Sequence, residues 1–208
     1  MFLTISPDNY ASEIKVAISG APGRLSQVQG GAVPTGDRYV LLFGATGPHV
    51  FAGPTPAGLH AKLSAGDRKM LAMRRGERAN IMTEEARIIG PAARRPEAEM
   101  ALSPCIQIGS FNAGAWTDED ELAAWYAQWR LPCMQKMPGC VRVRKLVSVA
   151  GWAKHAIVYE FTSVAARNEH FVDHERDNPQ MEEWTDQVVR KLVHAPGSPN
   201  LARRIWPE

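Results

Sequence analysis

The sequence predicts an α+β protein made of two tandem βαββαβ units whose antiparallel sheets pack together, and three observations support this. The 208 residues are enough for two units of about 100 residues each. Each half gives the order strand, helix, strand, strand, helix, strand. The apolar strand at 39–43 has a counterpart at 156–161, each followed by a turn and a helix. Because such a unit carries its helices on one sheet face, its other face needs a partner, which a second unit can supply.

The first unit, residues 1–90, is predicted from short apolar segments separated by turn residues. Its strongest strand is 38–43, which is rich in β-branched and aromatic residues. The segment 44–58 is dense in glycine and proline and, with His49, is a candidate lid. The other predicted elements are strands at 2–5, 27–33 and 79–89 and helices at 10–19 and 59–73.

The linker is predicted at 91–103. The stretch 91–104 contains three prolines and the pair Arg94–Arg95, and it has no sustained apolar period. This composition is typical of a connection between two folded units.

The second unit, residues 104–208, has clearer patterns. Its first strand, 105–111, alternates apolar and polar residues. Thr117 is a predicted N-cap, and the four acidic residues after it favour the positive end of a helix. That helix is expected to end near Arg130, because Pro132 interferes with its hydrogen bonds. The remaining predicted elements are a turn at 138–139, strands at 141–147, 155–162 and 201–206, the last at a sheet edge, and helices at 165–175 and 181–193.

Composition and charge indicate a broad class of protein and give no support to a nucleic-acid partner. Hydrophobic residues make up 45% and charged residues 22% of the chain, which is ordinary for a soluble protein. The formal net charge is +2 and basic residues form only short clusters, so no nucleic-acid partner is expected. Three cysteines without a CxxC pair, no signal-peptide pattern and no apolar run of about 18 residues predict a reduced, cytoplasmic protein without a membrane span.

The segment 125–139, WYAQWRLPCMQKMPG, followed by a strand that alternates apolar and basic residues, resembles the dimeric α/β-barrel superfamily. Within it, the segment is most similar to the EthD-like (ethyl tert-butyl ether degradation) proteins. In that group a helix with a Trp-His pair leads through a proline to a Pro-Gly turn. Trp129, Pro132 and Pro138–Gly139 fit this pattern, while Arg130 stands in place of the histidine.

The resemblance covers roughly residues 105–206, and over the first half it rests on element order alone. It implies two ferredoxin-like units packed as a dimeric α/β barrel, with a pocket between one sheet face and its helices, and further association into a homodimer is common among such proteins. Members include cofactor-free cyclases and isomerases, haem-binding dehydratases, monooxygenases and lyases. The fold therefore does not select a reaction.

His155 and Tyr159 are candidate catalytic residues on the strongest strand. Period-2 alternation places them on one face with Ile157 and Phe161. An imidazole near a phenol on an apolar face can serve as an acid/base pair. The alternative is a histidine at a strand end that bonds only to backbone or water.

His170 and His174 are four residues apart, so a helix would place them on one face, and Glu175 follows directly. This spacing suits a metal ligand pair, but no third ligand is evident and no metal or other cofactor is expected. The alternatives are histidines at the polar rim of an amphipathic helix, or His174 as a proton-transfer group without a metal.

Arginines and tryptophans of the second half are the candidate substrate-binding residues. Arg130, Arg142 and Arg144 can hold a carboxylate in a forked contact, and Arg142 and Arg144 point the same way on their strand. Solvated strand residues are the alternative for that pair. All six tryptophans lie beyond residue 103, so the main pocket is expected in the second half, although core packing also explains them. The predicted aromatic walls are Trp125, Trp129 and Trp152, with Trp184 and Tyr126 nearby.

No GxGxxG, GxxxxGK[ST], GxSxG or HExxH motif occurs, which disfavours dinucleotide, ATP and α/β-hydrolase chemistry. The leading expectation is a cofactor-independent lyase or isomerase that acts on a small aromatic or polyketide-like acid by proton transfer, in a decarboxylation, elimination or cyclisation. His155 or His174 would move the proton, Tyr159 would donate to an oxyanion and Arg130 would orient a carboxylate. The alternatives are an oxygenase or haem-dependent dehydratase, and a non-catalytic ligand-binding module.

Overall fold

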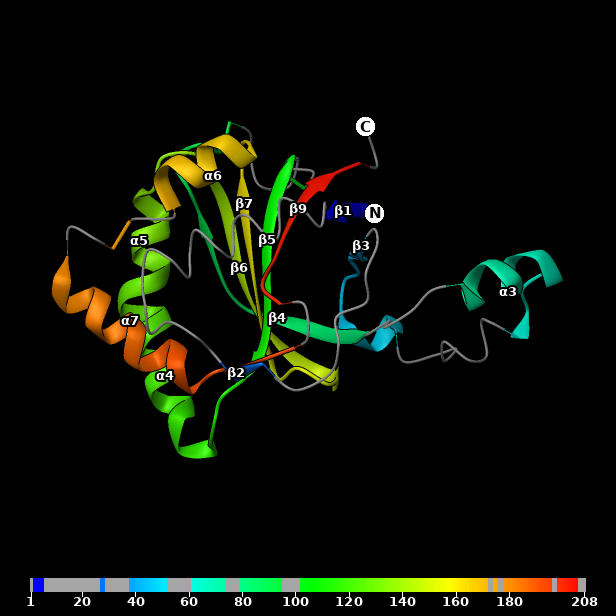
Figure 1. Ribbon diagram of the computed structural model, residues 1–208, viewed down its shortest axis with the longest axis horizontal. Helices are drawn as coiled ribbons and strands as arrows, with labels where there is room; N and C mark the ends of the chain where they lie inside the picture. The colour runs from blue at the N-terminus through cyan, green and yellow to red at the C-terminus, as the bar shows by residue number, and fades with distance from the viewer. Residues whose placement is uncertain are drawn as a thin grey trace.

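The computed structural model describes residues 2–5, 27–28, 38–51, 61–73, 79–94, 102–171, 174–175, 178–195 and 198–205. The predicted helix at 10–19, most of the predicted strand at 27–33 and Trp206 lie outside these residues. Within them the chain is an α+β structure, as the sequence predicts (Figure 1).

The described strands form one sheet of nine strands. They are β1 (Phe2–Ile5), β2 (Gln27–Val28), β3 (Arg38–Leu41), β4 (Asn80–Ile89), β5 (Cys105–Asn112), β6 (Cys140–Gly151), β7 (His155–Phe161), β8 (Val193–His194) and β9 (Asn200–Arg204). The order is β3-β1-β9-β5-β7-β6-β4, with β8 beside β5 and β2 beside β8. All pairs are antiparallel except β2 with β8.

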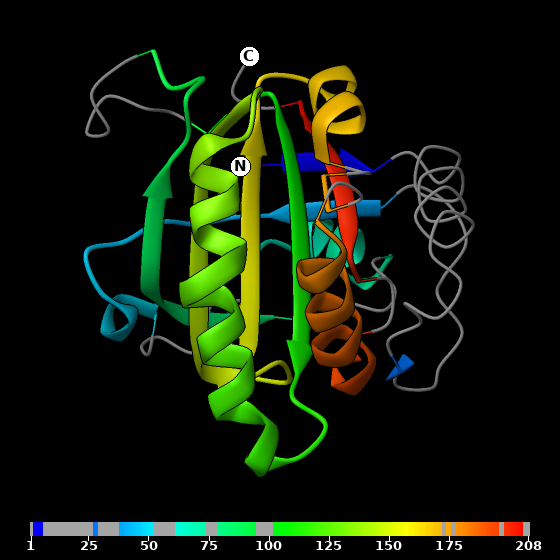
Figure 2. The ribbon, with the colours of Figure 1, turned by 90° about the vertical axis from the view of Figure 1, so that its left-hand side faces the viewer.

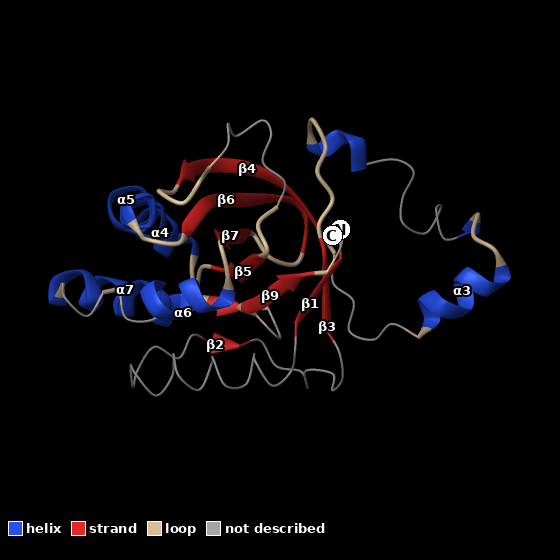
Figure 3. Ribbon diagram, turned by 90° about the horizontal axis from the view of Figure 1, so that it is seen from above, coloured by secondary structure: helices blue, strands red, loops and turns tan. Residues whose placement is uncertain are grey.

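Strands from both predicted units belong to this one sheet, whereas the sequence pattern predicts two sheets. β1 and β3 extend the sheet beyond β9, and β4 extends it beyond β6. The physical reason is that β9 and β6 would each leave one edge of backbone N–H and C=O groups without partners. These groups pair with β1 and with β4 instead. The sheet curls, so that β1 and β3 run crosswise behind β5 and β7 (Figures 2 and 3).

Helices of the second unit cover one face of the sheet (Figures 1 and 2). They are α4 (Glu119–Trp125), α5 (Leu131–Lys136), α6 (Val164–Phe171) and α7 (Pro179–Lys191), and a π turn (Tyr126–Arg130) joins α4 to α5. Helix α3 (Ala65–Ala72) has no buried residue and stands apart from the sheet in Figure 1. No described helix has the length and apolar character needed to cross a membrane.

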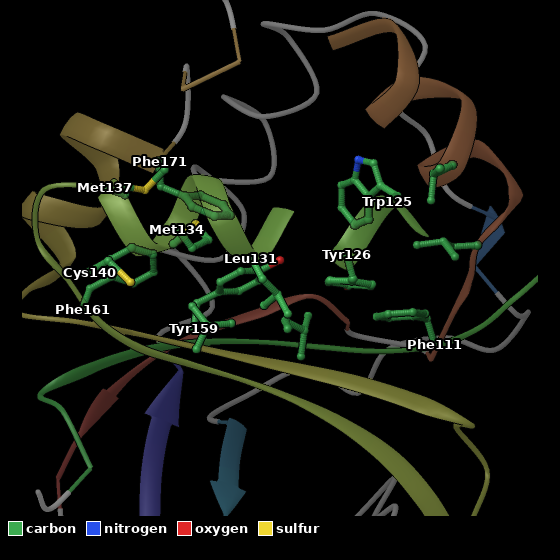
Figure 4. Packing of buried hydrophobic residues seen from close by; sticks show 14 of the residues in the cluster. Phe111, Trp125, Tyr126, Leu131, Met134, Met137, Cys140, Tyr159, Phe161 and Phe171 are labelled. Carbon is green, nitrogen blue, oxygen red and sulfur yellow. The ribbon is translucent and has the colours of Figure 1, made fainter. Parts of the chain in front are cut away.

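The main core lies between these helices and the sheet (Figure 4). It is built from large side chains of β5, β7 and the helices, including Phe111, Trp125, Tyr159, Phe161 and Phe171. A smaller apolar cluster fills the opposite face, where Val40 and Leu42 pack against Ile106 and Val158. The predicted alternation in β7 is confirmed, because Tyr159 and Phe161 belong to the first cluster and Val158 to the second.

The helix predicted to end at Arg130 instead continues to Lys136, so that prediction was wrong. The N–H of Leu131 bonds to the carbonyl of Tyr126, five residues back, which is the wider spacing of a π turn. Pro132 then sits in the first turn of α5, where a missing N–H costs little. The sequence carries no local pattern for such a turn.

Three other features of the second half also differ from prediction: an N-cap, the position of a strand in the sheet, and the end of a helix. Thr117 lies inside a short 3₁₀ helix, Trp116–Asp118, and is not the N-cap of α4. β9 is not an edge strand, because it pairs with β5 on one side and β1 on the other. Helix α6 ends at Phe171, so His170 and His174 do not share a helix face.

Gly139 is expected to be required for the turn between α5 and β6. Its φ is +76°, and a Cβ there would lie 2.9 Å from the Cβ of Ala166. Gly139→Ala is therefore expected to lower the free energy of unfolding by about 1–3 kcal/mol in chemical denaturation. The control is Gly66→Ala in α3, where a Cβ meets only ordinary contact and no loss is expected. Equal stability of Gly139→Ala and the parent would contradict the assignment.

Candidate functional site

Arg130, at the end of the π turn, is the centre of a buried polar group on the helix-covered face of the sheet. Its Nε donates to the hydroxyl of Tyr159 on β7 at 3.0 Å. Its Nη1 lies 3.0 Å from Oε1 of Glu175 and 2.6 Å from Nε2 of His174. The π turn, β7 and the turn at 174–175 thus bring a cation, a phenol, an imidazole and a carboxylate together. We call these four residues the Arg130 group.

Aromatic rings surround the guanidinium of Arg130. Its Cζ lies 5.2 Å from the ring centroid of Trp125, 5.5 Å from that of Tyr159 and 4.9 Å from that of Phe171. These are cation–π distances, and Figure 4 shows Tyr159 and Phe171 on the helix-covered side of the sheet, with Trp125 farther from the sheet than Tyr126. Burial opposes the charge of Arg130, but Tyr159 and Glu175 outweigh it and raise its pKa, so Arg130 remains a cation.

Glu175 is held by a tryptophan side chain of the π turn and a threonine side chain of α7. Its Oε1 accepts from Nε1 of Trp129 at 3.3 Å and from Oγ1 of Thr185 at 2.8 Å. Thr185 in turn accepts from Nε1 of Trp125 at 3.0 Å. Trp125 and Trp129 therefore position the carboxylate as well as providing aromatic surface.

Tyr159 carries its proton in this environment. Burial is the main cause of the raised pKa of both Tyr159 and its neighbour Tyr126. Because the Tyr159 oxygen accepts from Arg130, its own O–H is directed elsewhere. Tyr159 is thus a hydrogen-bond donor next to a fixed cation.

His174 is neutral in this arrangement. A guanidinium can only donate, so Nε2 of His174 accepts from Arg130, and its Nδ1–H donates to the carbonyl of Phe171. His170 lies elsewhere, half-buried, with Glu169 at 3.8 Å. Among the described residues, no three His, Cys, Asp or Glu side chains gather as metal ligands would.

His155 belongs to a second polar group at the start of β7. It lies four residues from Tyr159 along the strand, or roughly 13 Å, so the two side chains are in separate groups. Nδ1 of His155 is 2.9 Å from Nζ of Lys145, and Nε2 is 2.8 Å from Oε2 of Glu119. Burial and the charge of Lys145 lower the pKa of His155, which favours the neutral imidazole.

Arg142 and Arg144 face the opposite side of the sheet, where both bind Glu160. The Nε and Nη2 of Arg142 form a forked pair with the two oxygens of Glu160 at 2.8 and 3.1 Å. Nη2 of Arg144 lies 3.1 Å from Oε1 of the same carboxylate. The prediction that these arginines point the same way is confirmed. Arg142 is buried and not a solvated strand residue.

The structure thus brings together five of the eight predicted site residues, namely Arg130, Tyr159, His174, Trp125 and Trp129. His155 lies in the second group, Arg142 on the other sheet face, and Trp152 in the turn from β6 to β7. The sequence did not indicate Thr185, Lys145 or Glu119 as members of these groups, and it indicated Glu175 only as the residue that follows His174. For Lys145 a signal existed, because it occupies the apolar phase of β6 between Val143 and Val147.

Comparison with protein-family models, with curated proteins and with solved structures finds no match.

Proposed function

We propose that the chain is a cofactor-independent lyase or isomerase that acts on a small aromatic or polyketide-like acid by proton transfer, with the Arg130 group as its active site. One observation carries the proposal: a permanent cation, a neutral imidazole and a protonated phenol converge from three separate elements. These are the groups needed to bind a carboxylate, move a proton and stabilise an oxyanion.

In the proposed reaction the substrate carboxylate replaces His174 as the acceptor of Arg130 Nη1. Such a contact is strong because the guanidinium matches a carboxylate in shape and charge. The exchange frees the lone pair on Nε2 of His174 to accept a proton from the substrate. The bond from Nδ1 to the carbonyl of Phe171 keeps the ring in the required tautomer.

Tyr159 stabilises the negative charge that develops on a substrate oxygen. Its O–H is free of the Arg130 contact, and its raised pKa keeps the proton in place. Decarboxylation, elimination and cyclisation all place such charge on an oxygen next to the reacting carbon, which a fixed donor stabilises. Trp125 and Trp129 form the flat walls for an aromatic ring.

The arrangement of the second unit supports a fold of the dimeric α/β-barrel type. Its strand order β9-β5-β7-β6, with helices between β5 and β6 and between β7 and β9, is the order of a ferredoxin-like unit. We propose that residues 1–90 form the matching unit and that residues 91–103 link the two. In this proposal β1 and β3 belong to the first unit and cover the sheet face that the helices leave free. A homodimer and a cytoplasmic location belong to the same proposal.

The test incubates the protein with a panel of aromatic and 3-oxo acids in D₂O and follows loss of CO₂ or water and deuterium incorporation by NMR. His174→Gln and Tyr159→Phe are each expected to reduce turnover by about 100-fold or more, and Arg130→Lys mainly to raise KM. His170→Gln is the control, since His170 lies outside the Arg130 group, and its turnover is expected to equal that of the parent.

Other outcomes favour the alternative functions. Quenching of tryptophan fluorescence by aromatic acids without any turnover would favour a ligand-binding module. A Soret band in the purified protein, or oxygen consumption with a panel member, would favour the dehydratase or oxygenase.

A further inference from the structure

We propose that Lys145 is an amine nucleophile that forms an imine with small carbonyl compounds, assisted by His155 and Glu119. These three residues lie outside the Arg130 group, so the inference does not depend on the proposed function. The ligand class is an aldehyde or a 2-oxo acid, because only a reactive carbonyl carbon forms such a bond with an amine.

The geometry is that of a nucleophile, a base and a group that orients the base. Nζ of Lys145 is 2.9 Å from Nδ1 of His155, whose Nε2 is 2.8 Å from Oε2 of Glu119. An ammonium can only donate, so Nδ1 carries the lone pair and Nε2–H points to the carboxylate. A proton that passes from Nζ to Nδ1 therefore creates an imidazolium directly against Glu119.

Glu119 is itself fixed in place. Its other oxygen, Oε1, binds Nζ of Lys154 at 2.9 Å. Burial would raise the pKa of Glu119, but the contacts with Lys154 and His155 outweigh it and lower that pKa. The carboxylate is therefore charged and able to stabilise an imidazolium on His155.

The surroundings of Lys145 favour its neutral amine. Its side chain is only 3% exposed, and in β6 it has the same phase as Val143, which belongs to the main core. Nζ lies 5.3 Å from the ring centroid of Tyr126, and Phe111 stacks on His155 at 5.8 Å. Burial is the largest cause of the lowered pKa of Lys145, and it outweighs the attraction of Glu85.

Glu85 marks the side from which a carbonyl compound reaches Nζ. Its Oε2 lies 2.9 Å from Nζ, while its side chain is 45% exposed. It comes from β4, the outer strand at this end of the described sheet, at a shift in register between Glu84 and Ala86. Because this half-exposed side chain contacts Nζ directly, the proposal assigns Glu85 the role of a gate to the amine.

The bond-forming step balances without any oxidant or reductant. The Nζ lone pair attacks the carbonyl carbon, the C=O π pair moves to oxygen, and His155 returns the proton taken from Nζ to that oxygen. Water then leaves as the second Nζ proton is transferred to the departing hydroxyl. The net change converts a lysine ammonium and a carbonyl compound into an iminium and one water, with charge conserved.

The experiment traps the imine by reduction with cyanoborohydride in the full-length protein, with propanal and with pyruvate as separate probes. Peptide mass spectrometry then gives the rate of alkylation at each lysine. Lys154 is the matched control, because it binds the same Glu119 but is 53% exposed. Lys145 is expected to react at least about tenfold faster than Lys154, with both probes or with pyruvate alone if the substrate is an oxo acid.

Two variants test the roles of the neighbours. His155→Gln is expected to slow alkylation of Lys145 by about tenfold or more and leave Lys154 unchanged, while Glu85→Gln is expected to accelerate Lys145 several-fold. A Lys145 rate at or below that of Lys154, in both the parent and folded Glu85→Gln, would overturn the proposal. An unchanged Lys145 rate in His155→Gln would overturn the assisted mechanism. Neither readout involves turnover at the Arg130 group, so the two proposals fail separately.

Discussion

Replacement of Glu160 by glutamine is expected to lower the free energy of unfolding by about 3–5 kcal/mol. Glu160 is fully buried and accepts from Arg142, from Arg144 and from the backbone N–H of Ser103. Without the charge of Glu160, the guanidinium groups of Arg142 and Arg144 lose the carboxylate that both bind on the sheet face opposite the helices. The cost is large because a buried charge that loses its partner cannot regain its hydration.

The measurement is chemical denaturation of the parent and the variant at neutral pH. The matched control is Glu84→Gln, whose partner Arg87 is 39% exposed, so that a change within about 1 kcal/mol is expected. Replacing Arg142, Arg144 and Glu160 together by methionine is expected to recover part of the loss, since no unpaired charge then remains. A loss below about 1 kcal/mol for Glu160→Gln would show that the arginines reach solvent in the folded chain.

Local patterns predicted the strands within 104–208 well, for a physical reason. Alternation with period 2 in 155–161 depends only on strand geometry, and it correctly separated Tyr159 and Phe161 from Val158. The same rule correctly placed Arg142 and Arg144 on one side. Their partner Glu160 lies on the neighbouring strand, and no local pattern pairs it with them.

Features that depend on distant residues were not predictable in this way. β9 reads as an edge strand because nothing near it in the sequence indicates pairing with β1, nearly 200 residues away. The helix that passes Pro132 depends on a π turn, which has no recognisable sequence signal. For β9, the contact with β1 decides what local propensity leaves open.

In the candidate site, too, some residues could be predicted from local sequence and others could not. Arg130 stood out because it stands where the resemblance of 125–139 implies a histidine, and it is the residue around which Tyr159 and His174 gather. Glu119 was interpreted only as an acidic residue at a helix start. Its contact with His155 links α4 to β7, which only the packing of the helix on the sheet determines.

Acidification is expected to destabilise the protein through His194, by roughly 3 kcal/mol between pH 7 and pH 4. Burial lowers the pKa of His194 from 6.5 to about 4. Its ring packs on Phe111 at 5.4 Å, and within the described structure its Nδ1 is buried without a hydrogen-bond partner. Protonation in the folded state would place a charge in surroundings whose burial disfavours it.

The direction of this change in stability follows from how many protons His194 binds in the folded and in the unfolded chain. Between the folded pKa of about 4 and the unfolded pKa of 6.5, the unfolded chain binds more protons at this residue. The free energy of unfolding therefore falls as pH decreases through this window, and above pH 6.5 the contribution of His194 does not change with pH. Each unit of pKa difference corresponds to about 1.36 kcal/mol, which gives the size of the loss.

Denaturation curves at pH 7, 6, 5 and 4 for the parent and His194→Phe isolate this contribution. The variant keeps a ring against Phe111 but cannot titrate, so its stability is expected to fall less on acidification. His155, whose pKa is also lowered, is present in both proteins and its effect cancels in the difference. His49→Gln, at an exposed position, is expected to follow the parent curve. Parallel curves for His194→Phe and the parent would mean that the imidazole of His194 is charged and hydrated in the folded protein, because only then would its proton affinity match that of the unfolded chain.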